Sequence, residues 1–407
     1  MADQKRILIL TADAGYGHRS AANAIAAALQ EKHGTECTFE VVNVLDHEHT
    51  PAFLRDSQTD YDRIARERPE FHKFSYEATD NAAPKTILDR GLQVMLYSAM
   101  RRVLHDWQPE VIISTYPLYQ AALGAVFSIT KKFIPLMTVV TDLITVHQIW
   151  FSEYSDLTVV PTPTVRDLAV EAGLPADRVE VIGIPVQPRL SQETHDKAAL
   201  RGELGWDPAL TTVLIVSSKR SSSSAEVTHV LNHSGLPLQL VLVAGGDDDR
   251  YAQLQQTEWH RPAHLYNFVK NMPAMMCASD LIICKAGGLT VTESLACGLP
   301  LLLTDVIPGQ ETGNAQYVIE GGAGEMLEEP LKALETMCHL FLNDGQLLKE
   351  RSAKAKQLGR PRAAYDIVDR AWHLTQRGPV TKEASQIPLL PRLLELFKQY
   401  DVVLEEE

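Results

Sequence analysis

The sequence predicts an α/β protein that consists of two Rossmann-like domains in series. Short runs of Val, Ile and Leu, typical of buried parallel strands, alternate with segments rich in helix formers along most of the chain. A glycine turn joins a strand to a helix in each half, at 15–17 and at 287–288. The chain has 407 residues, which is enough for two or three domains.

The first half opens with a strand over 6–11, a glycine turn, a helix over 20–30 and a second strand over 39–44. This order is typical of the start of a doubly wound domain. A charged, His-rich and aromatic insertion follows at 46–110 and has helical character over 86–107. Further strands are predicted at 111–115, 135–140, 157–161 and 179–183.

A polar segment with two prolines, 185–207, predicts the linker between the domains. We therefore expect an N-terminal domain over 1–184, a C-terminal domain over 208–365 and C-terminal helices over 366–407. The strands expected in the second domain are 212–216, 238–244, 264–267, 281–284 and 300–304. The last segment predicts an amphipathic helix with these residues on one side: Leu389, Leu393, Leu396 and Phe397.

Composition limits the classes of partner. The formal net charge of -14 argues against nucleic acid and against anionic membranes, except through a local apolar contact. The five cysteines are odd in number and lack CxxC spacing, so we expect reduced thiols, no disulfide framework and no metal site. The N-terminal residues do not resemble a signal peptide, and no run is long enough to span a membrane. We expect a cytoplasmic protein, with a peripheral position at the inner face of the cell membrane as the alternative.

The first glycine turn contains Gly15 and Gly17 and is followed by His18 at the start of a helix. The positive end of the helix favours the neutral imidazole, which suits a general base. The alternative is a capping or surface histidine. The turn lacks the third glycine of a dinucleotide site.

The segment 140–151 places a polar group at the end of a strand, where α/β sheets gather functional residues. It contains Asp142 and His147, and Trp150 with Phe151 could border an apolar acceptor pocket. The alternative is a packed strand end with a capping aspartate.

The segment 280–300 reads as strand, glycine turn, helix and next strand. Gly287 and Gly288 would let backbone N–H groups approach a diphosphate at the helix start, with Thr290 completing the cradle. Glu293, one turn further, could accept hydrogen bonds from ribose hydroxyls. The alternative is a plain glycine turn.

The segment 307–316 follows a strand and precedes a helix. Its polar residues Gln310, Glu311 and Asn314 could bind sugar hydroxyls in paired hydrogen bonds. The alternative is a solvated polar loop.

Together these segments resemble the monogalactosyldiacylglycerol synthase and diacylglycerol glucosyltransferase family, which has the GT-B fold and is related to the peptidoglycan N-acetylglucosaminyltransferase. The family patterns GGGHR, VTDLxxxHxxWF, KAGPxTxxE and GQExGN correspond here to 15–19, 140–151, 285–293 and 309–314. The four motifs keep their order between about 6 and 326. The resemblance implies two domains facing a cleft, with the C-terminal helix crossing back to the N-terminal domain.

The resemblance implies that a hexose moves with inversion from a UDP-sugar to a lipid such as diacylglycerol, with no cofactor or metal. His18 would be the base, with Asp142 in support, and Gly15, Gly17, His147 and Trp150 would lie on the acceptor side. Gln310, Glu311 and Asn314 would bind the sugar, Glu293 the ribose, and the insertion at 46–110 would meet lipid. The remaining donor residues would be Phe268 and Val269 beside uracil, and Lys285, Ala286, Gly287, Gly288, Leu289 and Thr290 at the diphosphate.

The sequence departs from the family at Tyr16, at Gly288 and at the first turn of the second domain, where 217–224 is rich in serine instead of glycine. Two other functions therefore stay open. One is a GT-B transferase with a polyprenyl-linked or soluble acceptor, and the other is a catalytically idle nucleotide-sugar-binding protein. The helical part of the insertion is either an interfacial membrane helix or a helix packed on its domain.

Overall fold

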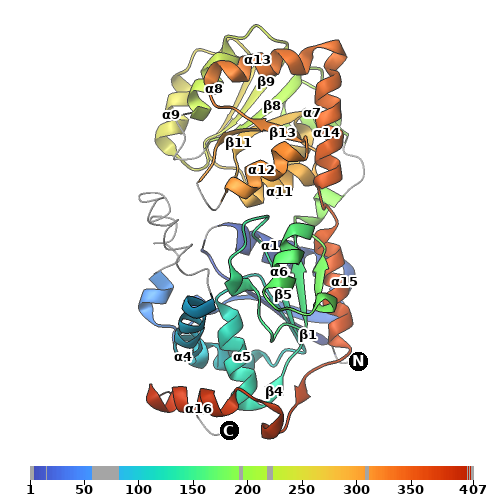
Figure 1. Ribbon diagram of the computed structural model, residues 1–407. Helices are drawn as coiled ribbons and strands as arrows, with labels where there is room; N and C mark the ends of the chain where they lie inside the picture. Colours follow the sequence, from blue (N-terminus) through green and yellow to red (C-terminus); the bar gives the residue numbers. More distant parts are fainter. Residues whose placement is uncertain are drawn as a thin grey trace. The chain divides into compact units, whose positions relative to one another are not determined.

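A computed structural model of the chain describes residues 4–14, 16–56, 82–191, 196–217, 223–307, 311–400, 402 and 404. The chain forms two compact units. The first comprises 1–185 with 363–407, and the second comprises 186–362. Each unit is built on a parallel sheet of six strands flanked by helices (Figure 1).

The sheet of the first unit has the order β2-β1-β3-β5-β6-β7. Its inner strands are mostly apolar because both faces of the sheet are covered there. The bounds of the six strands are β1 Lys5–Thr11, β2 Cys37–Asn43, β3 Val111–Ser114, β5 Leu136–Val139, β6 Leu157–Val160 and β7 Val179–Val181.

Alternate residues of β1 supply two different cores, as expected for a strand with helices on both sides. Ile7 and Ile9 pack with helices α1 (Tyr16–His33) and α15 (Ala363–Thr375). Leu8 and Leu10 face the core that contains α4 (Ala82–Trp107) and α5 (Tyr119–Thr130). Helix α6 (Pro163–Glu171) packs against β7.

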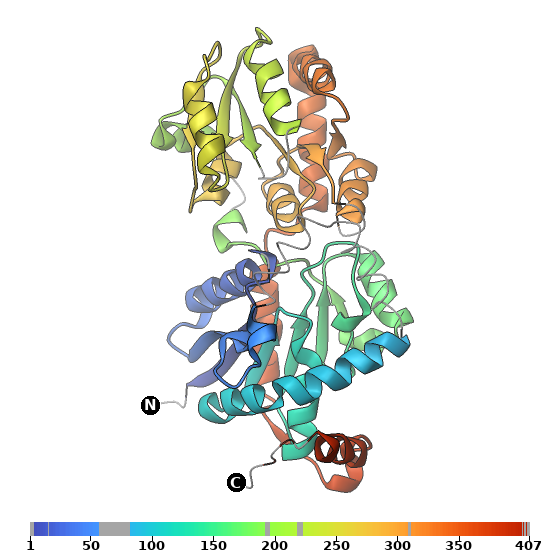
Figure 2. The same cartoon turned by 90° about the vertical axis from the view of Figure 1, so that its left-hand side faces the viewer.

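The C-terminal segment belongs to the first unit. The short strand β14 (Val380–Thr381) pairs with β4 (Lys132–Phe133), and α16 (Leu390–Gln399) follows it. Phe397 of α16 is buried and its ring lies 4.7 Å from that of Tyr97 on α4. Figures 1 and 2 show α16 beside α4 and α5. The expected return of the C-terminal helix to the N-terminal domain is confirmed.

The sheet of the second unit has the order β10-β9-β8-β11-β12-β13. The helices are α7 Lys197–Leu204, α8 Ser223–Asn232, α9 Asp248–Gln256, α10 Met272–Ala278, α11 Gly288–Ala296, α12 Thr312–Glu320, α13 Pro330–Phe341 and α14 Gln346–Leu358. The strands are β8 Thr211–Val216, β9 Leu238–Val243, β10 Ala263–Tyr266, β11 Leu281–Lys285, β12 Leu301–Asp305 and β13 Gly324–Met326.

The segment 186–207 differs from the predicted linker, because its described part packs within the second unit. Arg201 of α7 is buried, donates to the Ala278 carbonyl at 2.8 Å and binds Asp280 at 2.6 Å. The short strand β13 was not predicted. Its three residues include Gly324, where an added Cβ would lie 1.9 Å from the Leu301 carbonyl oxygen.

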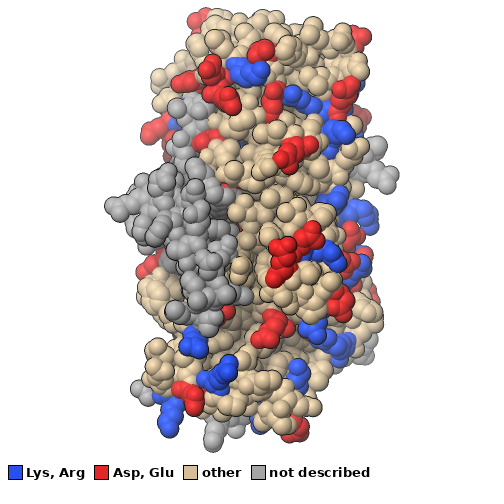
Figure 3. Space-filling view, in the orientation of Figure 1, with Lys and Arg blue, Asp and Glu red and all other residues tan. Residues whose placement is uncertain are grey.

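Part of the insertion, 57–81, lies outside the described residues, and the rest is a packed helix. Leu92, Leu96 and Met100 of α4 are buried in the core that α5 shares. This burial favours the packed alternative for α4. In the described ranges, no helix combines the length and the apolar character needed to cross a bilayer. On the face shown in Figure 3, charged side chains of both signs are interspersed.

Candidate active site

The strongest candidate site lies at the carboxyl end of β11. The strand is buried and apolar up to Lys285, and Ala286 and Gly287 then lead into α11. Gly287 is the N-cap with no side-chain cap bond described, and the first turn of α11 has no acidic residue. The N–H groups of Gly288, Leu289 and Thr290 belong to this first turn, where helical N–H groups have no acceptor within the helix. The turn therefore presents donors and partial positive charge to an anion.

Two residues of the fourth motif join this helix start. The Lys285 ammonium forms an ion pair with Glu311, whose other oxygen accepts from the Ile307 N–H at 3.0 Å. Asn314 Nδ2 donates to the Ala286 carbonyl at 3.0 Å. Glu311 and Asn314 are both buried. Glu311 therefore keeps the Lys285 ammonium beside the glycine turn, and the Asn314 amide lies next to it.

The glycines leave room at this turn. A Cβ on Gly287 would lie 3.1 Å from Lys285 Nζ and 3.6 Å from Glu311 Oε1. A Cβ on Gly288 would lie 3.6 Å from Asn314 Nδ2. A side chain at 287 would therefore crowd the ammonium group, while a methyl at 288 would fit.

Glu293 lies within α11 and is buried. Desolvation raises the pKa of its carboxyl to about 7, and the positive charge of Arg189 offsets part of this shift. Arg189 belongs to the short turn Pro188–Ser191 of the same unit. A buried carboxyl that titrates near neutrality accepts hydrogen bonds from hydroxyl groups most strongly after it loses its proton, because both of its oxygens are then charged acceptors.

Phe268 and Val269 follow β10, at the same edge of the sheet as the end of β11. Phe268 is 64% exposed, which is unusual for a phenylalanine. Gly246, with φ of 79°, lies beside its ring, where an added Cβ would be 3.9 Å from Cδ2. An exposed ring of this kind offers a surface to a planar base.

The described residues do not include two predicted site residues, Gln310 and Gly15, or most of the serine-rich turn.

A second candidate centre lies in the first unit, around the start of α1. Thr141 Oγ1 lies 2.8 Å from His18 Nδ1. Tyr116 and Trp150 stand beside the imidazole, with ring centroids 5.1 Å and 5.9 Å away. Burial lowers the pKa of His18 to about 4, partly offset by a hydrogen bond with the Thr115 backbone. The ring is neutral as predicted, but burial is the main cause.

Trp150 was expected to border an open acceptor pocket. Its side chain is instead fully buried in the core beside Val140 and Val160. Its Nε1 donates to Asp142 Oδ2 at 2.7 Å. Desolvation raises the pKa of Asp142 to about 6, and this bond lowers it in part. Trp150 therefore positions Asp142.

His147 is also buried, and its Nδ1 accepts from the Ile149 N–H at 3.0 Å. This bond caps the short turn Gln148–Trp150 and leaves Nε2 to carry the proton of a neutral ring. His147 thus shapes the turn that presents Trp150. A Cβ on Gly17 would meet no described atom within 4 Å, so the start of α1 has open space on that side.

A polar network that the motifs did not predict fixes the first turn. Arg19 binds Asp13 through both carboxylate oxygens, at 2.8 Å and 2.9 Å. Asn43 Nδ2 also donates to Asp13, at 3.3 Å, and Tyr119 bridges Asn43 Oδ1 and the Thr11 carbonyl. The signal available in the sequence was that Asp13, Arg19 and Asn43 each stand next to the end of a predicted strand or turn.

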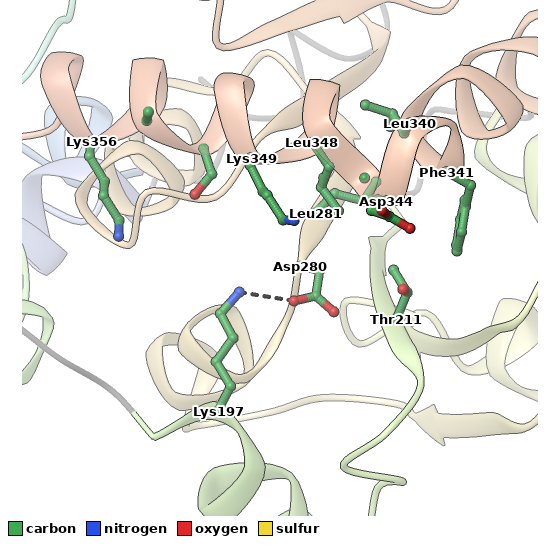
Figure 4. A pocket seen from close by; sticks show the side chains of 13 residues that line it. Lys197, Thr211, Asp280, Leu281, Leu340, Phe341, Asp344, Leu348, Lys349 and Lys356 are labelled. Carbon is green, nitrogen blue, oxygen red and sulfur yellow. Dashed lines mark hydrogen bonds and ion pairs between the residues drawn. The ribbon is translucent and has the colours of Figure 1, made fainter.

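A cavity of about 620 Å³ lies elsewhere in the second unit (Figure 4). Thr211 and Leu281, at the amino ends of β8 and β11, line it, so it opens at the sheet edge opposite to the glycine turn. Lys349 and Lys356 of α14 point into it, and Lys197 lies across from them, bound to Asp280 at 3.0 Å. Ligands of open α/β sheets bind at the carboxyl edge, so this cavity is not the candidate site.

In the described ranges, no cluster of His, Cys, Asp and Glu is arranged to hold a metal ion.

Comparisons with known proteins cover both units. Residues 18–186 match the family described as monogalactosyldiacylglycerol (MGDG) synthase, and residues 220–367 match the glycosyltransferase family 28 C-terminal domain. The chloroplastic monogalactosyldiacylglycerol synthase of Spinacia oleracea is 33% identical over 378 residues, which are 89% of this chain and 71% of that protein.

Solved structures are similar in fold. MurG of Acinetobacter baumannii has a TM-score of 0.57 at 18% identity, over 91% of this chain and 99% of that one. HepE of Anabaena, in complex with UDP-glucose, has a TM-score of 0.53 at 14% identity, over 90% and 99%. These similarities confirm the expected fold, GT-B, with two Rossmann-like domains.

Proposed function

Because the chain belongs to the monogalactosyldiacylglycerol synthase family, we propose that it transfers galactose from UDP-galactose to diacylglycerol, with inversion at the anomeric carbon. The coarser function, a glycosyltransferase that uses a UDP-sugar, follows from membership of the family. The sugar and the acceptor are those in the name of the relatives. The observation that carries the proposal is the uncapped start of α11 with Lys285, Glu311 and Asn314 around it.

The donor would bind this cluster through its diphosphate. The N–H groups of the first turn and the Lys285 ammonium supply hydrogen bonds and positive charge for the leaving UDP. The ion pair with Glu311 keeps the ammonium beside Gly287 until the donor arrives. Glu311, Gln310 and Asn314 would bind the sugar, Glu293 the ribose, and Phe268 with Val269 the uracil.

His18 would act as the base. Its pKa of about 4 keeps the imidazole neutral at physiological pH, as proton abstraction requires. When Thr141 Oγ1 accepts from Nδ1–H, the lone pair of Nε2 is available for the acceptor hydroxyl. The acceptor oxygen then bonds to the anomeric carbon, the bond from that carbon to the diphosphate oxygen breaks, and the hydroxyl proton ends on His18. These steps need no cofactor.

A donor and acceptor screen tests this function. UDP release should require both UDP-galactose and diacylglycerol, and the product should carry a β-linked galactose by NMR. UDP-glucose, UDP-N-acetylglucosamine, polyprenyl-linked acceptors and soluble acceptors serve as competing substrates. Preference for one of these would overturn the sugar or the acceptor assignment, and UDP-sugar binding without turnover would indicate the idle protein.

The variant His18→Ala tests the base. Transfer should fall by roughly 100-fold or more, while the affinity for UDP stays within about twofold, because His18 acts on the acceptor. The matched control is His373→Ala, which removes an exposed imidazole from α15 of the same unit. Loss of UDP affinity in the His18 variant alone would contradict the base assignment.

We also propose a peripheral contact with the cytoplasmic face of a membrane, because diacylglycerol resides in bilayers. Phe53 supports this contact, since it is 60% exposed and adjoins the segment 57–81 of the insertion. Phe53→Asp should weaken co-sedimentation with diacylglycerol-containing vesicles. Leu331→Asp, at a 68% exposed position of α13, is the control. Equal binding by the two variants would refute the role of Phe53.

A further inference from the structure

The cavity at the amino edge of the second sheet has no part in the proposed transfer reaction (Figure 4). Its volume of about 620 Å³ lies within the range of about 300–1,000 Å³ that is usual for small-molecule sites. One wall is α14, and Lys197 of α7 lies on the opposite wall. Thr211 and Leu281, the first residues of β8 and β11, lie between these walls. The cavity therefore has the size of a ligand site and lies away from the glycine turn.

Lysine side chains reach into this cavity from two sides. Lys349 and Lys356 are seven residues apart, so they lie on the same face of α14, about 10 Å from each other along its axis. The ion pairs among the described residues do not include either of these two ammonium groups. Lys197 lies across the cavity and binds Asp280 at 3.0 Å. Two cations on one helix face are therefore available to an anion.

The charge of the lining is opposite in sign to that of the whole protein. The lining carries three ammonium groups and two carboxylates, those of Asp280 and Asp344, in a chain of net charge -14. Asp280 is already neutralised, because buried Arg201 binds one of its oxygens at 2.6 Å and Lys197 binds the other. The lining therefore has a surplus of positive charge, which attracts anions to the cavity.

Packing holds the α14 wall in place. The alkyl chain of Lys356 lies against Gly298, where an added Cβ would be 2.4 Å from Lys356 Cγ. Ser352, which lines the cavity between the two lysines of α14, donates its hydroxyl to the Gly298 carbonyl at 2.7 Å. The Lys356 ammonium is thus carried on a stem that is already ordered. Less side-chain entropy is then lost when an anion binds to it.

The end of the cavity away from Lys356 has a different character (Figure 4). Leu340 and Phe341, at the end of α13, line it. Asp344 reaches it from a turn in which Asn343 and Asp344 have φ of 51° and 54°. Asn and Asp adopt this left-handed conformation more readily than other residues with a side chain. This end therefore offers an aromatic surface and a carboxylate that accepts hydrogen bonds.

We propose that this cavity binds a nucleoside phosphate at a site separate from the donor site. Lys349 and Lys356 bind the phosphate groups. The base packs on the Phe341 ring, and Asp344 accepts hydrogen bonds from ribose hydroxyls. Inorganic phosphate would leave the apolar end unfilled, and the acyl chains of a lipid would need a longer apolar wall than Leu340 and Phe341 provide. The cavity opens at the sheet edge opposite to the glycine turn, so this site does not depend on the proposed transfer reaction.

Calorimetric titration of the full-length protein with ADP tests the site, because ADP has two phosphates and lacks the uracil of the donor. One equivalent of ADP should bind. Adenosine and inorganic pyrophosphate, titrated separately, should each bind roughly tenfold or more weakly than ADP, since each fills only one end of the cavity. Absence of ADP binding would overturn the proposal. Pyrophosphate that binds as tightly as ADP would also overturn it, because the apolar end would then contribute nothing.

Lysine variants locate the bound nucleotide. The double variant Lys349→Gln with Lys356→Gln should bind ADP roughly 20-fold or more weakly, because two charge-assisted hydrogen bonds are lost. The matched control is Lys354→Gln, an exposed lysine of α14 outside the cavity lining, which should bind ADP like the wild type. Transfer from UDP-galactose should not change in the double variant.

Two results with these variants would overturn the proposal. Unchanged ADP affinity in the double variant would place the nucleotide elsewhere. An equal loss in Lys354→Gln would indicate unspecific attraction of anions to α14. Absence of transfer from UDP-galactose by the wild type would instead refute the proposed function, while the ADP titrations still decide this site.

Discussion

Thr141 Oγ1 lies 2.8 Å from His18 Nδ1, and this hydrogen bond joins residues 123 positions apart in the chain. Thr141 follows β5, whereas His18 stands in the first turn of α1. The bond engages Nδ1, so Nε2 is the ring nitrogen that the proposed mechanism uses as the base. The hydroxyl of Thr141 is the direct partner of the imidazole, and Asp142 is held by Trp150.

Thr141→Val should lower kcat by roughly 10- to 100-fold, part of the 10²–10⁴-fold that a general base contributes. The valine has a similar shape but leaves His18 Nδ1 without its partner. Affinity for UDP-galactose should not change, because the donor cluster lies in the other unit. Thr141→Ser keeps the hydroxyl and should restore most of the activity. Equal loss in both variants would indicate a packing role.

His18→Gln should stabilise the protein selectively at acid pH. The folded-state pKa of His18 is about 4, below its ordinary value of 6.5. Between these values the unfolded chain binds a proton that the folded protein excludes, so stability falls as pH decreases from 6.5 toward 4. Removal of the imidazole abolishes this loss. The melting temperature of the variant relative to the wild type should therefore rise from pH 7 to pH 5.

Asp142→Asn should show the opposite dependence on pH. The folded-state pKa of Asp142 is about 6, above its ordinary value of 3.8. The carboxyl therefore lowers stability as pH rises from 3.8 through 6. Asparagine can still accept from Trp150 Nε1 and carries no charge. Its melting temperature relative to the wild type should be higher at pH 7.5 than at pH 4.5, and a constant difference would contradict the raised pKa.

Glu293→Gln should remove a pH dependence from donor binding. With a pKa of about 7 in the free protein, the carboxyl accepts from the ribose hydroxyls through both charged oxygens, and therefore most strongly, once it has lost its proton. UDP-galactose should bind the wild type roughly tenfold more weakly at pH 6 than at pH 8. The variant should bind weakly at both values.

The control for Glu293 is Glu335→Gln on α13, whose carboxylate is exposed and paired with Lys332. This variant should keep the wild-type pH profile. Calorimetry in buffers of different ionisation enthalpy measures the released proton directly. Binding of the donor to the wild type at pH 6 without proton release would exclude Glu293 as the ribose ligand.

Phe397→Ala should destabilise the first unit by about 3–5 kcal/mol, since it deletes a buried ring that packs on Tyr97. Leu394→Ala on the same helix is the control, because that side chain is 44% exposed and should cost about 0.5 kcal/mol or less. Denaturant unfolding compares the two. Similar small losses would show that α16 contributes little to the unit.

Local patterns predict most of the fold because each strand and helix carries its own signal. The apolar run of β1 and the glycine turn before α11 follow from short stretches of sequence. The strand β13 could not be predicted in this way, because it has only three residues and one of them is a glycine. That glycine is required by close contact with the Leu301 backbone, which the sequence does not show. The segment 186–207 was predicted to be a linker because it is polar. Sequence alone does not show that one of its charged residues, Arg201, forms a buried ion pair with Asp280.

The candidate site also has a part that the sequence predicts and a part that only the fold decides. Lys285, Glu293 and Glu311 stand in motifs that sequence alone identifies, but their bonds depend on how β11, β12 and α12 meet. The roles of Trp150 and His147 were not predictable from the sequence. The same residue types occur both in the lining of pockets and in buried cores. Only packing shows that both are buried.

The sequence by itself determined the two α/β units and the chemical types of residue at each strand end, whereas the return of the C-terminal helix was implied by the family resemblance. Periodicity and glycine turns are properties of neighbouring residues, so they can be read along the chain. The tertiary structure alone decided the partner of His18, the pKa of Glu293 and the meeting of Lys197 with the lysines of α14 around one cavity. These depend on distance and desolvation between segments far apart in sequence, which exist only once the chain has folded.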